Sequence, residues 1–396
     1  MTARPPSSET PIEYGATDGD TPSPGAVSSE VTSVARSAGA LALHTDLLGV
    51  LHVPDGAARS GETTELEALA ARAAVYATRA RGEGTRRVYR SAWRAYEAWC
   101  RSLGREPLAG DPELVAIYAT RRADQGVAVS TVRVDLAAIR TAHLLAGVPL
   151  DTRHPGLAMV VEGITRGRGT RPAKQAAPAV PAVLRLMLAA CAPAATALGA
   201  RDRAMLLLGF GAALRRSELV ALRVGDVESV PGRGLRLLVR RSKTDQHGRG
   251  QDVAVWANPA EPRLCPAAAL DAWLAHRRGA KDLDWSAPKS QRRERPLFCA
   301  VTKAGRPTGA PLSDKAVARL VKQAAGRAGL DPGRYSGHSL RAGLATAAGD
   351  GGANLADLMR QTRHRSTQVA LACLRPADLW RNNVTQGVFG AAKDEA

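Results

Sequence analysis

The chain has 396 residues, of which 45% are hydrophobic and only 4% are aromatic. This length allows two domains with a core each, and the scarcity of aromatic residues favours helical cores of Ala, Leu and Val over a β-sandwich. The formal net charge is +18, and because residues 1–60 carry −4, the remaining 336 residues carry +22. Such an excess favours a polyanionic partner, most simply nucleic acid, over a basic protein that its charge merely keeps in solution.

Other classes of protein are disfavoured by what the sequence lacks. The five cysteines are widely spaced, without a Cys-x-x-Cys pair or a zinc-ligand spacing, so we expect no structural metal and a reducing compartment. There is no Walker-type loop, and we expect no cofactor. Because the sequence has no start typical of a signal peptide and no apolar run of about 20 residues, we expect a cytoplasmic protein without a membrane span. The Ala-, Arg- and Gly-rich composition suits a high-GC bacterial source, in which a protein that binds nucleic acid would be nucleoid-associated.

The N-terminal part of the chain divides into a tail and a helical domain. Residues 1–63 are at first rich in Ser, Thr, Pro and Gly, which predicts a disordered tail. Residues 64–165 predict a four-helix domain, because apolar residues recur at helical spacing between short loops. We expect the third helix to begin with Asp111 as its N-cap and Pro112 in its first turn. We expect Ser130 to cap the fourth helix.

Basic residues are concentrated on the second and fourth predicted helices and just after them. Those on the second helix include Arg86, Arg87, Arg90 and Arg94. A solvated helix face usually explains such residues, but their number favours contact with DNA backbone phosphates. Residues 166–180 combine basic residues with Gly and Pro, which predicts a basic interdomain linker.

The second predicted domain covers residues 181–390, and residues 391–396 form a short tail. Most of the domain has helical periodicity. Two strand-like runs at 235–239 and 252–256 flank a turn that contains glycine, which predicts a β-hairpin. The predicted fold class is therefore α+β, with a four-helix N-terminal domain and a mainly helical second domain that carries a small β-sheet.

Two motifs near this hairpin contain basic residues of interest. Residues 214–219 read Leu-Arg-Arg-Ser-Glu-Leu, in which Glu218 is placed to reach back to Arg215 or to cap the start of a helix. Taken alone, an ordinary capped helix with a surface arginine explains this motif. Lys243 stands in a Ser-Lys-Thr-Asp sequence on the approach to the hairpin turn, where most lysines are simply solvated.

The C-terminal stretch is the richest in His and Arg. His338 and Arg341 are three residues apart and would share one face of a helix. The pair Arg363-His364 follows, and Cys373 stands nine residues after His364. A face of His and Arg without a nearby carboxylate suits an anion, most commonly a phosphodiester.

These motifs together resemble those of the tyrosine recombinases, the phage integrase family, over about residues 64–390. The family has an arginine in a Leu-Arg-x-Ser-Glu-Leu box, a lysine on a hairpin, a His-x-x-Arg motif and a Gly-His pair or a close variant of it. The matching positions in this sequence are Arg215, Lys243, His338, Arg341 and His364. Arg363 stands where the family has Gly, and Cys373 stands where it has the nucleophilic Tyr. The four-helix domain resembles the family's SAM-like core-binding domain.

The resemblance implies metal-free DNA cleavage and rejoining through a covalent 3′-phospho-protein intermediate, in a tetramer assembled on double-stranded DNA. Arg215 and Arg341 would hold the non-bridging phosphate oxygens. Lys243 would protonate the 5′-oxygen leaving group, and His338 and His364 would move protons or orient the phosphate. A related topoisomerase, which relaxes supercoils without sequence preference, is an alternative.

Three interpretations of Cys373 stay open. The thiolate is a strong nucleophile and acts itself; or the cysteine is a loss of the nucleophile, in a protein that binds DNA without cutting it; or it fills a buried position. Its side chain is much shorter than that of Tyr, and near-attack geometry tolerates only about 1 Å of error before about 100-fold of rate is lost. Loss of cleavage is therefore favoured over a working cysteine. The alternative function is a non-catalytic accessory or competitor protein on the same fold.

Overall fold

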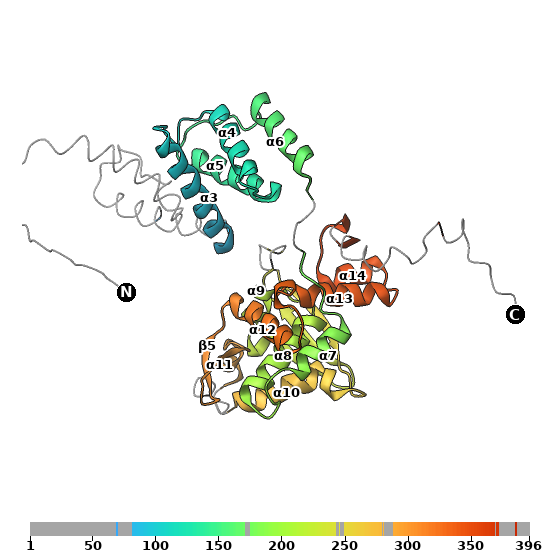
Figure 1. Ribbon diagram of the computed structural model, residues 1–396. Helices are drawn as coiled ribbons and strands as arrows, with labels where there is room; N and C mark the ends of the chain where they lie inside the picture. Colours follow the sequence, from blue (N-terminus) through green and yellow to red (C-terminus); the bar gives the residue numbers. More distant parts are fainter. Residues whose placement is uncertain are drawn as a thin grey trace, which may run out of the picture. The chain divides into compact units, whose positions relative to one another are not determined.

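The computed structural model describes residues 81–170, 175–242, 245, 249–278, 280, 288–368 and 370–371, and the single residues 69 and 385. The chain forms two compact units that divide at residues 173–174 (Figure 1). No helix within these described ranges has the length and apolar character needed to cross a membrane.

Four helices make up the described part of the first unit. They are α3 (Glu83–Ser102), α4 (Pro112–Asp124), α5 (Val129–Leu145) and α6 (Pro155–Arg168). Their core is unusually aromatic for this sequence, because Trp93, Tyr96 and Tyr118 are almost fully buried. The rings of Tyr96 and Tyr118 meet edge to face with centroids 5.0 Å apart, a favoured arrangement. The second, third and fourth predicted helices are thus confirmed, whereas the first predicted helix lies almost wholly outside the described residues.

Of the two helix N-caps predicted for this unit, one is confirmed and one is wrong. Asp111 caps α4 as predicted, since its carboxylate accepts hydrogen bonds from the backbone N–H groups of Glu113 (2.8 Å) and Leu114 (3.2 Å). Ser130 does not cap α5, because the helix already begins at Val129 and its N-cap is Ala128. Helix α6 was not predicted, since its glycines lower its helix propensity.

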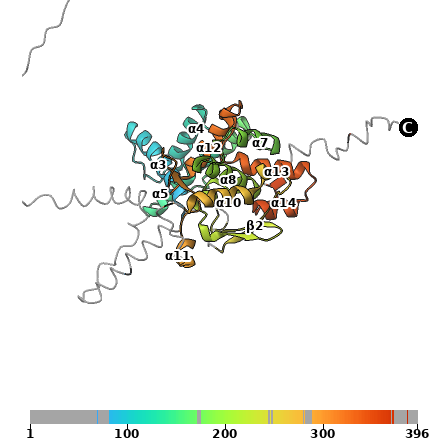
Figure 2. The same cartoon turned by 90° about the horizontal axis from the view of Figure 1, so that it is seen from below.

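The second unit is built mainly of helices around one hydrophobic core. Its α-helices are α7 (Pro181–Ala189), α8 (Ala197–Gly211), α9 (Arg216–Ala221), α10 (Pro266–Arg277), α11 (Lys289–Arg293), α12 (Asp314–Arg327), α13 (Ser339–Asp350) and α14 (Leu355–Thr362). Short 3-10 turns lie at Val224–Asp226, Pro262–Leu264 and Pro332–Arg334. Helix α8 runs through the middle, with α7, α10, α12 and α13 packed about it (Figures 1 and 2). Its residues 204–208 are all buried, which explains the uninterrupted apolar run there.

Two small antiparallel sheets complete the second unit. The first consists of β1 (Val227–Val230), β2 (Gly234–Val239) and β3 (Gln251–Trp256) in that order. The pairs Leu235 with Val255 and Leu237 with Val253 put one face of the β2–β3 ribbon into the core, while Arg236, Ala254 and Trp256 on the other face are exposed. The second sheet pairs β4 (Cys299–Val301) with β5 (Pro307–Pro311). The predicted hairpin and the α+β class are confirmed.

The region predicted as a linker, 166–180, divides between the two units. Residues 166–168 complete α6. From residue 175 the chain is extended and bonded to the second unit: the Ala177 N–H donates to the Arg334 carbonyl at 2.8 Å and the Ala179 N–H to the Ser339 carbonyl at 2.9 Å. Gly343 permits this close approach, because a Cβ there would lie 2.2 Å from the Ala179 carbonyl oxygen. The segment thus packs directly on α13.

Candidate active site

The candidate site is built around the end of helix α8. This helix ends at Gly211, and Ala213 follows with φ of 47°, a left-handed conformation that turns the chain sharply. The last carbonyl groups of a helix have no partner within it and carry its partial negative charge. Here the carbonyl oxygens of Gly211, Ala212 and Ala213 accept hydrogen bonds from side chains at least 128 positions later in the chain. The turn therefore brings distant donors together.

Two buried arginines bind this turn. Arg341, on α13, is 2% exposed and donates from Nη1 to the Ala213 carbonyl at 2.7 Å. Arg363, which ends α14, donates from Nη1 to the Ala212 carbonyl at 2.9 Å and from Nη2 to the Ala213 carbonyl at 3.1 Å. One carbonyl, that of Ala213, thus receives a hydrogen bond from each arginine. The sequence predicted Arg341 as a site residue but Arg363 only as half of a basic pair.

A buried carboxylate links Arg363 to a third arginine. Glu218 accepts from the backbone N–H of Arg215 at 3.0 Å and from the Arg215 guanidinium at 2.6 Å, so both predicted roles of Glu218 are confirmed. Oε2, the oxygen that accepts from the Arg215 backbone N–H, also accepts from Arg363 Nη2 at 2.8 Å. The sequence-based description of a cationic face without a nearby carboxylate is therefore wrong. The carboxylate comes from α9, far upstream in the chain.

The ionisation of Glu218 follows from these contacts. Burial raises the pKa of its carboxyl, but the guanidinium groups of Arg363 and Arg215 together outweigh burial and hold that pKa below its ordinary value. Glu218 is therefore charged at neutral pH. One negative charge between two guanidinium groups leaves the trio with a net charge of +1. Arg215 is the accessible member, because its side chain is 20% exposed while those of Glu218 and Arg363 are each 2% exposed.

His338 lies immediately before α13 and is its N-cap residue. The surrounding protein atoms lower the pKa of its imidazole, and the charges of Arg341 and Arg215 lower it further, although part of the side chain is exposed. Both arginines therefore lie close enough to His338 to repel an added proton. The imidazole is neutral at pH 7.

His364 is neutral as well, and its tautomer can be assigned. Burial is the largest cause and, together with the charges of Arg341 and Arg215, lowers the pKa of its imidazole to about 4. The Thr362 hydroxyl donates its only proton to the Leu358 carbonyl at 2.6 Å. Because Thr362 Oγ1 also lies 2.9 Å from His364 Nδ1, that nitrogen must be the donor between them. The neutral ring then carries its proton on Nδ1 and leaves Nε2 unprotonated.

The two remaining predicted site residues, Lys243 and Cys373, lie outside the described residues. The four that the structure describes come from three separate segments and share one electrostatic environment. These four are Arg215, His338, Arg341 and His364. The assembled group has the form of an anion site, with guanidinium donors beside neutral imidazoles.

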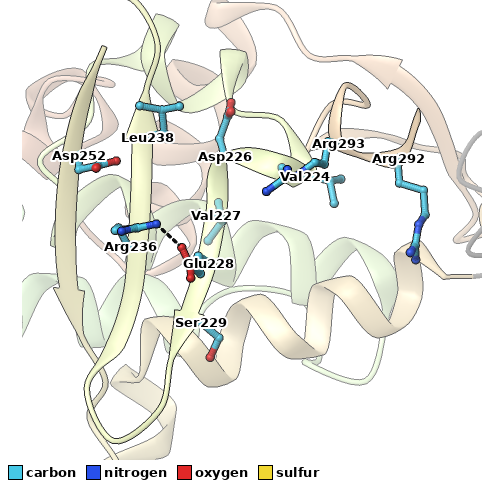
Figure 3. Close-up of a pocket in the computed structure, with 11 residues that line it drawn as sticks. Val224, Asp226, Val227, Glu228, Ser229, Arg236, Leu238, Asp252, Arg292 and Arg293 are labelled. Atoms are coloured by element: carbon cyan, nitrogen blue, oxygen red, sulfur yellow. Dashed lines mark hydrogen bonds and ion pairs between the residues drawn. The ribbon is translucent and has the colours of Figure 1, made fainter. Parts of the chain in front are cut away.

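Two grooves lie along the three-stranded sheet of the same unit. Figure 3 shows the first, of about 740 Å³, between β1 and β2 and the basic helix α11. Its charged residues are Asp226, Glu228, Asp252, Arg236, Arg292 and Arg293. The signs balance, and Glu228 is bound by Arg236 at 2.5 Å, so this groove is a poor site for a polyanion. The charged residues of the second groove, of about 610 Å³, are Glu218 and Asp226 with Arg223, Arg240, Arg241 and Arg249. This groove therefore carries a net positive charge and touches the candidate site at Glu218.

Comparison with known proteins agrees with this geometry. A family model described as the phage integrase family matches residues 181–372. An integrase/recombinase xerD homolog of Selenomonas ruminantium is 30% identical over 316 residues, which cover 78% of this chain and 87% of that protein. The chain belongs to the phage integrase family. A tyrosine recombinase of Synechococcus elongatus is 31% identical over 295 residues, 72% of this chain and 82% of that relative.

The fold agrees with that of a solved site-specific recombinase. The crystal structure of the XerH site-specific recombinase bound to a palindromic difH substrate superimposes with a TM-score of 0.53, covering 89% of this chain and 94% of that one at 15% identity. At this identity the likeness concerns the fold alone. It confirms the predicted combination of a helical N-terminal part and an integrase-type catalytic domain.

Proposed function

We propose that this integrase-family chain is a site-specific DNA recombinase, which cuts and rejoins DNA strands without a metal ion. The convergence of two arginines and two neutral histidines near one turn carries the proposal. These residues are Arg215, Arg341, His338 and His364. Such a set can neutralise a phosphodiester and handle protons, and it needs no metal ligands.

In the proposed reaction the arginines bind the non-bridging oxygens of the scissile phosphate. Arg215 has an accessible guanidinium, and Arg341 is fixed by the Ala213 carbonyl. Both charges are present before the substrate arrives, so they stabilise the added negative charge of the transition state without reorganising. Loss of one such contact typically raises the barrier by on the order of 3 kcal/mol.

The proposed reaction needs two proton transfers, one from the nucleophile and one to the leaving group. In the first, the nucleophile loses its proton, for which His364 Nε2 is a suitable acceptor because its Nδ1 is already committed to Thr362. In the second, the bond between phosphorus and the 5′-oxygen breaks, and the 5′-oxygen takes a proton from Lys243. The strand is then held as a 3′-phospho-protein until another 5′-hydroxyl displaces the protein.

Residue 373 decides how the reaction proceeds in this chain. A cysteine at the position of the family's tyrosine favours a second candidate function, that of a DNA-binding accessory or competitor protein that does not cut. We propose that the rest of the catalytic group is competent. On this proposal a Cys373→Tyr chain cleaves DNA, whatever the activity of the cysteine itself.

We further propose that the chain acts as a tetramer on double-stranded DNA. The net charge of +22 after residue 60 supports DNA binding. The XerH relative was crystallised on DNA, and a lambda integrase fragment as a dimer bound to a core site. A tetramer would place two synapsed sites together for strand exchange.

A strand-exchange assay tests the proposed function. The DNA site is first selected from random-sequence duplexes by binding to the full-length chain. Two labelled duplexes that carry this site are then incubated with the unsubstituted chain, the Cys373→Tyr chain, or a mixture. We expect recombinant duplexes from the Cys373→Tyr chain. If no combination yields recombinants while binding persists, the accessory function is supported and the recombinase proposal fails; relaxation of supercoiled DNA lacking the site would instead indicate a topoisomerase.

A further inference from the structure

Arg363 differs from the residue expected in the family, and the proposed mechanism gives it no role. It stands where the family has Gly, immediately before His364, and its backbone is left-handed with φ of 57°. Glycine adopts this conformation without penalty, whereas a side chain with a Cβ is disfavoured there. A strained conformation of this kind persists only where surrounding contacts hold it.

The contacts of the Arg363 side chain stabilise this left-handed backbone conformation. The side chain is 2% exposed. Besides the carbonyls of Ala212 and Ala213, its guanidinium donates to the Gln361 carbonyl at 3.2 Å and to Glu218 at 2.8 Å. The planar guanidinium serves several acceptors in fixed directions, which a lysine does not do. Arg363 thus joins the end of α14, the turn after α8 and helix α9.

We propose that Arg363 is a positioning residue of the phosphate site. It fixes the Arg215 guanidinium through Glu218, which both arginines bind. It fixes the Arg341 guanidinium through the Ala213 carbonyl, which these two arginines share. This role rests on the proposed function, since it is defined by the scissile phosphate that Arg215 and Arg341 would bind.

The charge balance shows why the second arginine matters. With Arg363 present, the trio of Arg215, Glu218 and Arg363 carries +1. With Gly at position 363 the remaining pair would be neutral. Glu218 would then have Arg215 as its principal counter-ion and would compete with the phosphate for the same guanidinium. Because Arg363 neutralises Glu218, the positive charge of Arg215 remains available to bind an anion.

The test compares Arg363→Gly and Arg363→Lys with a matched control, Arg360→Ala. Arg360 lies on the same helix, is 74% exposed and pairs with Asp357. All variants are made in the full-length Cys373→Tyr chain, which serves as reference. The first readout is covalent capture of a nicked duplex that carries the selected site. The second readout compares two affinities, one for the duplex with a natural scissile phosphate and one for the duplex with an uncharged methylphosphonate there. Their ratio reports how strongly the arginines bind the phosphate charge, without cleavage.

We expect Arg363→Gly to slow covalent capture by on the order of 10- to 100-fold, as misplacement of a positioned group does. It should also reduce the preference for the charged linkage. Millimolar guanidinium, which fits the vacated space, should restore part of both, while urea at the same concentration should not. We expect Arg363→Lys to be intermediate, since it keeps the charge without the fork, and Arg360→Ala to match the reference within about twofold.

Two outcomes would overturn the proposal, and they are distinguishable. If the reference chain captures DNA and Arg363→Gly does so at the same rate with the same charge preference, Arg363 does not position the site. If the reference chain neither captures DNA nor prefers the charged linkage, the proposed function itself fails. In that case a double-mutant cycle of Arg363→Gly and Glu218→Gln in urea denaturation still tests the ion pair: the contact predicts nonadditive losses of stability, and additive losses would contradict it.

Discussion

Replacing Glu218 by Gln should destabilise the second unit strongly. The substitution keeps the side-chain shape but removes the charge between two guanidinium groups. Arg363 then remains buried without a counter-ion, and breaking a buried pair in this way typically costs about 3–5 kcal/mol. Because Gln retains one acceptor oxygen and Arg215 is partly exposed, we expect the lower end of this range, about 3 kcal/mol.

Urea denaturation of the full-length chain measures this effect. With a urea dependence of about 2 kcal/mol per M, a loss of about 3 kcal/mol lowers the midpoint of the second unit by about 1.5 M. Glu228→Gln is the matched control in the same unit, because Glu228 and Arg236 form a pair in which both side chains are more than half exposed. We expect that control to lose less than about 1 kcal/mol. Equal losses in the two variants would refute the reasoning.

The same substitution has a predictable pH dependence. The folded-state pKa of Glu218 lies below its ordinary value, which in an unfolded chain is about 4.3. The stability that the charged group contributes is therefore present above about pH 4.3 and is lost as the pH falls through the lower folded-state pKa. The difference between the unsubstituted chain and the Gln variant should shrink in that acid range. A difference that stays constant down to pH 3 would contradict the ionised state assigned to Glu218.

Further predictions concern a histidine and two glycines. In NMR titrations His364 should take up its proton near pH 4 and carry its neutral-state proton on Nδ1, and a midpoint above pH 6 would contradict its burial. Gly343→Ala should destabilise the second unit by about 1–3 kcal/mol in urea melts, because the new Cβ meets the Ala179 carbonyl. Gly163→Ala, in open space on α6, should instead stabilise the first unit by about 0.5–1 kcal/mol, and a loss there would be inconsistent with that space.

The sequence predicted best what depends on local chemistry. Helix α4 begins with an Asp111 side-chain cap followed by Pro112, which has no backbone N–H to donate to a preceding helical turn. These two neighbouring residues therefore determine where the helix begins. The β2–β3 hairpin follows from alternating apolar residues. The prediction for Ser130 was wrong because a serine in the first turn of a helix cannot be told from an N-cap serine by sequence alone. Ser130 is the second residue of α5. Helix α6 was missed because packing, rather than its glycine-rich sequence, stabilises it.

The candidate site was predictable only in part, because its residues meet through tertiary contacts. Arg215 and Glu218 are three residues apart, so their ion pair could be predicted from spacing. The contact between Glu218 and Arg363 spans 145 positions, and no local pattern indicates it. The one available signal was an arginine where the family has glycine. The shared Ala213 carbonyl is a backbone group, which side-chain motifs cannot reveal.

The most direct test of the account is covalent trapping on a nicked suicide duplex that carries the selected site. The unsubstituted chain, Cys373→Tyr and Cys373→Ala are incubated with the duplex and run on a denaturing gel. The account predicts a DNA-shifted band for Cys373→Tyr and none for Cys373→Ala. A band for the unsubstituted chain as well would identify Cys373 as a working nucleophile. If Cys373→Tyr binds the duplex but yields no band, the group around Arg215 and Arg341 is not a competent strand-cleavage site, and the central claim is wrong.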